Sequence, residues 1–110
     1  MLKASRSLAE QFPAGCLVVT YERLRAAPET EAARLFGFLG VSTDAAVVAD
    51  CVARTSFAAL SGGRPAGEGR DGTFYRKGVA GDWRSTFTDE MSDFMLQELG
   101  WMFPRFGWRR

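Results

Sequence analysis

Histidine is absent from the 110 residues, and cysteine occurs only as Cys16 and Cys51. The first absence excludes a histidine general base, and two cysteines supply too few ligands for a usual zinc site. Both cysteines lie within apolar runs, so we expect buried free thiols rather than a disulfide, which is typical of a cytoplasmic protein. No apolar run is long enough to span a bilayer, and no segment resembles a signal peptide.

The sequence also lacks an excess of charge of either sign. Its 14 lysines and arginines oppose 13 aspartates and glutamates, which leaves a formal net charge of +1. Such a balance creates no overall field that would attract nucleic acid or a membrane, so any basic site must be local. Hydrophobic residues make up 46% of the chain, which favours a folded chain of one domain at most.

Helical spacing of apolar residues predicts four helices, at about residues 2–12, 28–39, 44–54 and 89–99. Pro28 suits a first helical turn, and Gly40 suits the end of the same helix. Ser42 or Thr43 is expected to cap the third helix, and Thr88 the fourth. The buried faces of the last three helices are expected to consist of Ala32, Leu35, Phe36 and Leu39, of Val47, Val48, Cys51 and Val52, and of Met91, Phe94, Met95 and Leu99.

One segment, Cys-Leu-Val-Val-Thr-Tyr at residues 16–21, is short, β-branched and continuously apolar. This pattern predicts a strand buried on both faces, as in a parallel sheet between helices. Because one strand cannot form a sheet, two interpretations remain open. Either the fold is small and helical and the strand is wrongly predicted, or the chain is a piece of a larger α/β domain.

Residues 61–72 are rich in glycine and show no apolar pattern. A loop of this length in a compact domain is usually a functional lid or a mobile segment. We interpret it as a flexible loop, with a lid as the first reading and disorder as the second. It lacks the Gly-Lys-Ser/Thr ending of a phosphate-binding P-loop, so we do not interpret it as a P-loop.

After this loop the chain reads Arg76-Lys77-Gly78, and Gly-Asp-Trp follows at residues 81–83. Arginine offers phosphate a planar fork, lysine offers a point charge, and glycine lets backbone N–H groups approach the oxygens closely. As a bare tripeptide, the pattern is more typical of a solvated run of charge. The second glycine and Trp83, which we expect to be buried and to anchor the loop, favour an anion site instead.

Residues 76–88, RKGVAGDWRSTFT, resemble the C-terminal signature of the cytosolic-type sulfotransferases, which use 3′-phosphoadenylyl sulfate. Three other segments resemble the same family in the same order: VTYERL at 19–24, FGFLGV at 36–41 and TSF at 55–57. Arg23 stands where the family has an aspartate. The resemblance is strongest over residues 15–95. It implies that residues 1–110 are the C-terminal part of a P-loop-type sulfotransferase domain, an α/β fold that is mostly helical here with one core parallel strand.

The resemblance also implies a nucleotide cofactor, 3′-phosphoadenylyl sulfate or its product adenosine 3′,5′-bisphosphate. It assigns the 3′-phosphate to Arg76, Lys77 and Gly78. It assigns the adenine to Thr55, Ser56, Phe57 and Tyr21, with Phe57 touching the base. From the residues alone, packing in the core is the more usual role of Phe57 and Tyr21, whereas the resemblance favours the adenine pocket for both.

Several parts of the family's site lie before its Tyr-Glu-Asp strand and are not found in this chain. They are the phosphate-binding loop with its lysine for the 5′-phosphosulfate, the histidine base, and an arginine and a serine for the 3′-phosphate. We therefore assign no catalytic residue and no metal ligand, we do not expect the isolated chain to be active, and we regard a missing N-terminal half as a candidate partner. The family's dimer motif has a valine where Asp89 stands, which makes a family-type dimer doubtful.

Three functions follow as hypotheses. The first is a part of a sulfotransferase that moves a sulfuryl group from 3′-phosphoadenylyl sulfate to the hydroxyl or amine of a small-molecule acceptor. The alternative is a non-catalytic nucleotide-binding module of the same fold, so whether the chain belongs to an active enzyme stays open. A nucleic-acid binder would use Arg64, Arg70, Arg76, Lys77 and the aromatic tail. The near-zero net charge of the chain and its lack of a known nucleic-acid-binding motif disfavour this function. We expect neither nucleic acid nor a membrane as a partner.

Overall fold

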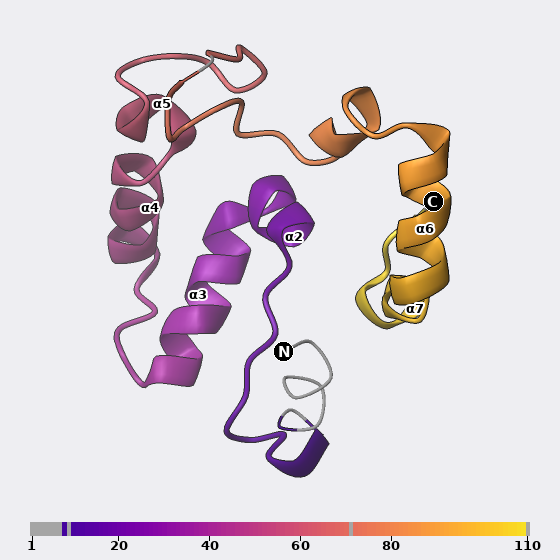
Figure 1. Ribbon diagram of the computed structural model, residues 1–110. Coiled ribbons are helices and arrows are strands. Elements are labelled where there is room, and N and C mark those ends of the chain that lie inside the picture. Colours follow the sequence, from indigo (N-terminus) through magenta and orange to yellow (C-terminus); the bar gives the residue numbers. More distant parts are fainter. Residues whose placement is uncertain (1–7, 9, 71, 110) are drawn as a thin grey trace. The chain divides into compact units, whose positions relative to one another are not determined.

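The computed structural model describes residue 8, residues 10–70 and residues 72–109. The described part of the chain is helical, with no strand, and divides into two compact units, Met1–Gly78 and Val79–Arg110 (Figure 1). The first unit contains α2 (Tyr21–Ala26), α3 (Pro28–Leu39), α4 (Ala45–Arg54) and α5 (Phe57–Leu60). The second unit contains the 3₁₀ helix η1 (Asp82–Ser85), α6 (Asp89–Leu99) and α7 (Met102–Phe106).

The predicted strand at residues 16–21 is not present. Residues 16–20 have no regular secondary structure, and α2 begins at Tyr21. A strand is defined by hydrogen bonds to a neighbouring strand, and the described residues provide no such neighbour. The backbone is nevertheless extended at Thr20, with φ −96° and ψ 146°. The parallel strand of the expected α/β fold is therefore wrong for this structure, whereas the mostly helical character is confirmed.

The helices α3 and α4 follow local sequence signals closely. Pro28 opens α3, and Gly40 ends it in the left-handed conformation at φ 72°, where a side chain would be strained. The start of α4 differs from the prediction, because its cap is Asp44 rather than Ser42 or Thr43. The Asp44 carboxylate accepts two backbone N–H bonds of the first turn at 3.0 and 3.3 Å, while Ser42 accepts the N–H of Asp44 at 3.2 Å.

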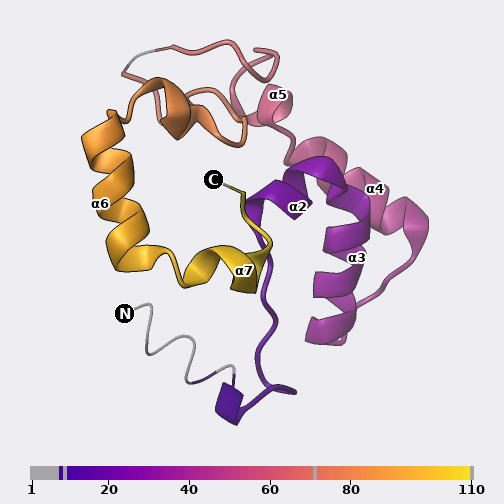
Figure 2. The ribbon, with the colours of Figure 1, turned by 90° about the vertical axis from the view of Figure 1, so that its right-hand side faces the viewer.

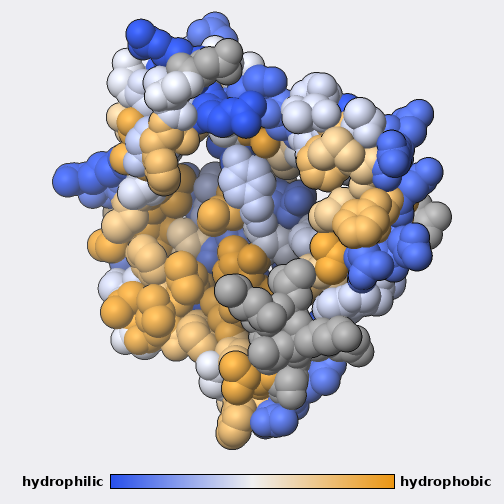
Figure 3. Space-filling view, in the orientation of Figure 1, coloured by the Kyte–Doolittle hydropathy of each residue, from blue (hydrophilic) through white to orange (hydrophobic). Residues whose placement is uncertain are grey.

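The first unit is built on the packing of α3 against α4, with α2 on α3 and α5 on α4 (Figures 1 and 2). Val48 of α4 is 2% exposed and Glu31 of α3 is 3% exposed. The expected apolar faces are covered only in part, because Leu35, Leu39 and Val47 remain exposed. Figure 3 shows apolar side chains at the surface over the region of α3 and α4.

The segment at residues 61–72 has neither helix nor strand where the structure describes it, in agreement with the predicted loop. Its flexibility and its role as a lid stay predictions. The helix predicted at residues 2–12 falls mostly outside the described residues, although residues 8, 10 and 11 are helical. Cys16 and Cys51 are free thiols, as expected, but both are half-buried rather than buried.

In the second unit, α6 begins where the sequence predicts. The Thr88 hydroxyl accepts the backbone N–H of Met91 at 3.2 Å and so caps the helix. The expected buried face of α6 is largely open, since Met91 is 47% and Phe94 61% exposed. Met102, at the start of α7, is the buried apolar residue of this unit's described part. No helix among the described residues is long and apolar enough to cross a membrane.

Candidate functional site

Two of the predicted site segments meet where the ring of Phe57 lies against Gly78. Gly78 has φ +65°, and a Cβ atom at this position would overlap Cδ2 and Cγ of the Phe57 ring and lie 2.9 Å from its Cε2. The ring therefore lies directly against the Gly78 backbone, and any side chain at residue 78 would push it away. The fold thus brings the Thr-Ser-Phe segment and the Arg-Lys-Gly segment together at this contact.

Thr55 and Ser56 lie at the junction of two helices, where each hydroxyl has a local partner. Thr55 ends α4 and donates its hydroxyl to the carbonyl of Cys51 at 2.8 Å. Ser56 caps α5 and accepts the backbone N–H of Ala59 at 3.2 Å. A hydroxyl has one proton and two lone pairs. The Thr55 oxygen therefore keeps the capacity to accept a further hydrogen bond, and the Ser56 hydroxyl keeps its proton for donation.

Arg76 and Lys77 are held by the glycine-rich loop through their main chain. The Arg76 carbonyl accepts from Arg64 Nη1 at 3.0 Å, and the Lys77 carbonyl accepts the N–H of Gly67 at 2.8 Å. The stem of Lys77 runs beside Gly69, where a Cβ atom would lie 3.0 Å from Lys77 Cε. Lys77 is half-buried and Arg76 is exposed. Two adjacent cations are thus presented on a backbone that the preceding loop anchors.

Arg64 is the residue of this region that sequence reasoning did not assign to the nucleotide site. Its guanidinium donates to the carbonyls of Glu68, Tyr75 and Arg76, and it lies over the Phe57 ring with Cζ 5.4 Å from the ring centroid. The sequence does not show which groups Arg64 binds, since its most distant carbonyl partner is twelve residues away. An arginine inside a glycine-rich loop was the one available signal, and it also applies to Arg70.

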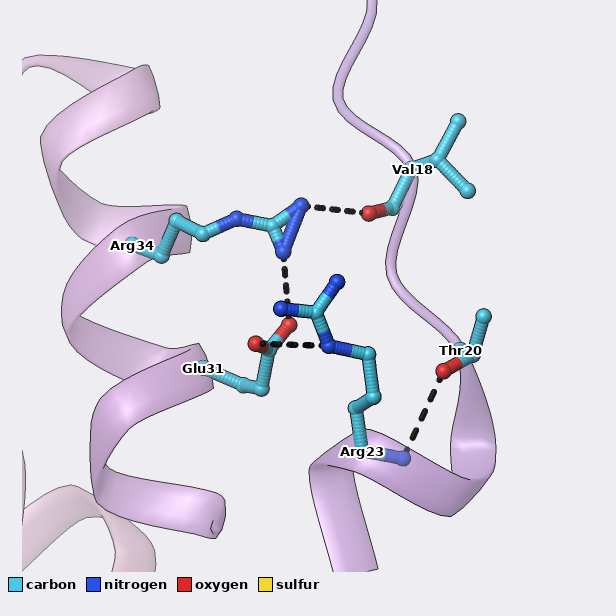
Figure 4. A network of polar contacts seen from close by, with 5 residues as sticks. All are labelled: Val18, Thr20, Arg23, Glu31 and Arg34. Carbon is cyan, nitrogen blue, oxygen red and sulfur yellow. Dashed lines mark hydrogen bonds and ion pairs between the residues drawn. The ribbon is translucent and has the colours of Figure 1, made fainter. Parts of the chain in front are cut away.

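Tyr21 does not join the other six candidates through any hydrogen bond, ion pair or ring contact of the described residues. It begins α2 and is 49% exposed. The segment before it is held from α3, because Arg34 Nη2 donates to the carbonyl of Val18 at 2.6 Å (Figure 4). Thr20 caps α2 by accepting the N–H of Arg23 at 3.4 Å. These contacts fix the start of α2 relative to α3.

The same network contains the buried carboxylate of the first unit. Glu31 accepts from Arg34 Nη1 at 2.8 Å and pairs with Arg23 Nε at 3.4 Å, so two cations face one carboxylate (Figure 4). Arg23 stands where the resembled family has an aspartate, and in this structure its guanidinium pairs with the Glu31 carboxylate. Of the two partners, Arg34 lies one turn along the same helix as Glu31, whereas Arg23 comes from α2, so the sequence alone does not show that both meet this carboxylate.

The Gly-Asp-Trp part of the motif belongs to the second unit. Trp83 is 39% exposed, so the expectation that it is buried is wrong. Its ring instead contacts the ring of Phe87, with 5.7 Å between the centroids. The Arg84 guanidinium lies over the Trp83 ring, with Cζ 4.7 Å from the ring centroid. Asp82 lies in η1, where the Ser85 hydroxyl donates to its carbonyl at 2.7 Å. The described residues gather no group of three or more aspartate, glutamate or cysteine ligands for a metal.

Comparison with known proteins gives one family and several relatives. The family model described as "Sulfotransferase domain" matches residues 5–98. Sulfotransferase 2B1 from Homo sapiens is 31% identical over 86 residues, which are 70% of this chain and 24% of the relative. Sulfotransferase 2B1 from Mus musculus is 32% identical over 104 residues, which are 84% of this chain and 31% of the relative.

The chain spans about a quarter to a third of the length of these relatives. No solved structure gives a significant match. The match of the family model extends over both compact units and includes the Thr-Ser-Phe and Arg-Lys-Gly segments.

Proposed function

Because the chain belongs to the sulfotransferase domain family, we propose that it carries part of the nucleotide site of a sulfotransferase. The reaction would transfer a sulfuryl group from 3′-phosphoadenylyl sulfate to the hydroxyl or amine of a small-molecule acceptor. The observation that carries this proposal is the contact between Phe57 and Gly78. It unites two segments, each resembling a nucleotide-binding part of the family, in one compact unit.

In this proposal the 3′-phosphate is bound by Arg76, Lys77 and Gly78. The arginine fork and the lysine ammonium supply charge-assisted hydrogen bonds, and the Gly78 backbone N–H is a further donor for a phosphate oxygen. The exposure of Arg76 supports an approach from solvent. The two adjacent positive charges would be compensated by the two negative charges of a phosphate monoester.

The adenine would lie against Phe57, with the hydroxyls of Thr55 and Ser56 beside it. Their hydrogen bonds within the chain leave Thr55 able to accept and Ser56 able to donate, and an adenine edge offers both kinds of partner. Tyr21 completes the proposed set from the start of α2. Its role rests on the family resemblance, and its exposed ring is compatible with a contact to a base.

The proposed role of this chain is binding rather than chemistry. The sequence contains no histidine to remove the acceptor's proton, and no Gly-Lys-Ser/Thr loop to neutralise the phosphosulfate. The proposal therefore puts both functions on polypeptide outside these 110 residues, and the isolated chain should bind nucleotide without turning it over. A non-catalytic nucleotide-binding module with the same site is the alternative.

The test is calorimetric titration of the full chain with adenosine 3′,5′-bisphosphate. An Arg76→Ala/Lys77→Ala double variant should bind at least about tenfold more weakly, because hydrogen bonds to charged groups contribute about 1.5–3 kcal/mol each and about 1.4 kcal/mol is tenfold. An Arg70→Ala/Arg109→Ala variant removes the same charge elsewhere and should bind within about twofold of the original. Absence of binding by the folded original chain, or equal losses in both variants, would contradict the proposal.

A further inference from the structure

Arg64 makes the largest set of long-range hydrogen bonds described in the first unit. Its Nη1 donates to the carbonyls of Glu68, at 3.1 Å, and Arg76, at 3.0 Å. Its Nη2 donates to the carbonyl of Tyr75 and lies 3.4 Å from the hydroxyl of Thr73. A guanidinium has five donors in a rigid plane, so one side chain joins both ends of the glycine-rich loop.

The carbonyls of Tyr75 and Arg76 belong to the two peptide planes that flank the Arg76 Cα atom. Because each peptide unit is planar, anchoring its carbonyl fixes the orientation of the whole unit. With both flanking units anchored, the direction in which the Arg76 side chain leaves the backbone is set. The bond from the Gly67 N–H to the Lys77 carbonyl, at 2.8 Å, fixes the next unit in the same way.

The other side of the site is also tied to Arg64. Its guanidinium carbon lies 5.4 Å from the centroid of the Phe57 ring, and this ring lies against Gly78. A cation over an aromatic face is attracted by the ring quadrupole. Arg64 therefore contacts the Phe57 ring, which lies against Gly78, and also the carbonyl of Arg76, two residues before Gly78 in the chain.

We propose that Arg64 is the positioning residue of the candidate nucleotide site. By holding the carbonyls of residues 68, 75 and 76 and the ring of Phe57, it presets the backbone that presents Arg76, Lys77 and Gly78 to a 3′-phosphate. This inference rests on the proposed function, because the ligand is the nucleotide proposed above. Arg64 acts by ordering the loop before the nucleotide binds. Binding to a loop that is already ordered costs less conformational entropy.

The test compares Arg64→Lys, which keeps the charge but loses the planar fork, with Arg70→Lys as a matched control in the same loop. Hydrogen exchange is measured on the full chain without nucleotide. Arg64→Lys should raise the exchange of the hydrogen-bonded amides of Gly67 and Glu68 by about tenfold or more, and should leave those of α3 and α4 unchanged. Arg70→Lys should change neither set.

Nucleotide affinity supplies the second readout. The affinity for adenosine 3′,5′-bisphosphate should fall about tenfold in Arg64→Lys. The affinity for adenosine 5′-phosphate, which lacks the 3′-phosphate, should change less than twofold, because lysine keeps a positive charge beside the Phe57 ring. A general loss of structure would weaken both nucleotides and raise exchange in α3 and α4, and that result would overturn the positioning role.

The two proposals fail differently. If the original chain binds the bisphosphate and Arg64→Lys binds it equally well, only the role of Arg64 is overturned. If exchange rises in Arg64→Lys without a loss of affinity, Arg64 orders the loop but does not position the site, and the proposal is again overturned. If the original chain binds neither nucleotide, the proposed function fails and the positioning role falls with it.

Discussion

Replacement of Glu31 by glutamine tests whether the buried ion-pair network stabilises the first unit. The Glu31 side chain is 3% exposed, and its oxygens lie 2.8 Å from Arg34 Nη1 and 3.4 Å from Arg23 Nε. Hydrogen bonds to charged groups contribute about 1.5–3 kcal/mol. Because Arg34 and Arg23 are 35% and 65% exposed, water screens both cations, and the lower end of this range applies. Glutamine also keeps one oxygen that can accept from Arg34, so we expect a loss of about 1.5 kcal/mol.

A second ion pair of the chain provides the matched control. Asp50 and Arg54 of α4 lie 2.9 Å apart, almost the same distance as Glu31 and Arg34, but their side chains are 59% and 77% exposed. Exposed pairs of this spacing on a helix contribute about 0.3–0.5 kcal/mol. Asp50→Asn should therefore cost about 0.3 kcal/mol. Glu29→Gln, in the first turn of α3, controls for the loss of a negative charge near a helix N-terminus.

The measurement is urea unfolding followed by far-ultraviolet circular dichroism, which reports the helices. With a slope of about 1.5 kcal/mol per molar urea, Glu31→Gln should lower the midpoint by about 1 M and Asp50→Asn by about 0.2 M, at unchanged slope. Equal shifts in the two variants would refute the reasoning, because burial would then not distinguish the pairs. A shift in Glu29→Gln as large as that of Glu31→Gln would assign the effect to the helix dipole instead.

Two further substitutions test local features of the site and of the second unit. Gly78→Ala should lower the urea midpoint by clearly more than Gly62→Ala. Both glycines have positive φ, which costs an alanine about 1–2 kcal/mol. At residue 78 the new Cβ would also overlap the Phe57 ring, whereas at residue 62 it would meet no atom within 4 Å. Equal midpoints would show that Phe57 does not lie against Gly78. Thr88→Ala should cost about 1 kcal/mol through loss of the α6 cap, whereas Thr86→Ala should be nearly neutral. The fraction of helix by circular dichroism and the unfolding midpoint check this pair.

Local signals in the sequence predicted the elements whose ends depend on near neighbours. Pro28 and Gly40 bound α3, and Thr88 caps α6, because each acts on backbone groups within one helical turn. The assignment of the Arg-Lys-Gly and Thr-Ser-Phe segments to a nucleotide site came from the family resemblance, and it stays a prediction. The strand at residues 16–21 could not be judged from local signals, since a strand exists only through hydrogen bonds to another segment.

The sequence by itself determined the ends of α3, the start of α6, the segment without helix or strand at residues 61–72, the lack of histidine and the family to which the chain belongs. Only the tertiary structure decided that Phe57 lies against Gly78, that Arg64 binds the carbonyls beside Arg76, and that Glu31 is the buried carboxylate. The physical reason is the range of the interactions involved. Caps and turns act over three or four residues, whereas ring packing and arginine–carbonyl bonds join residues that only folding brings together.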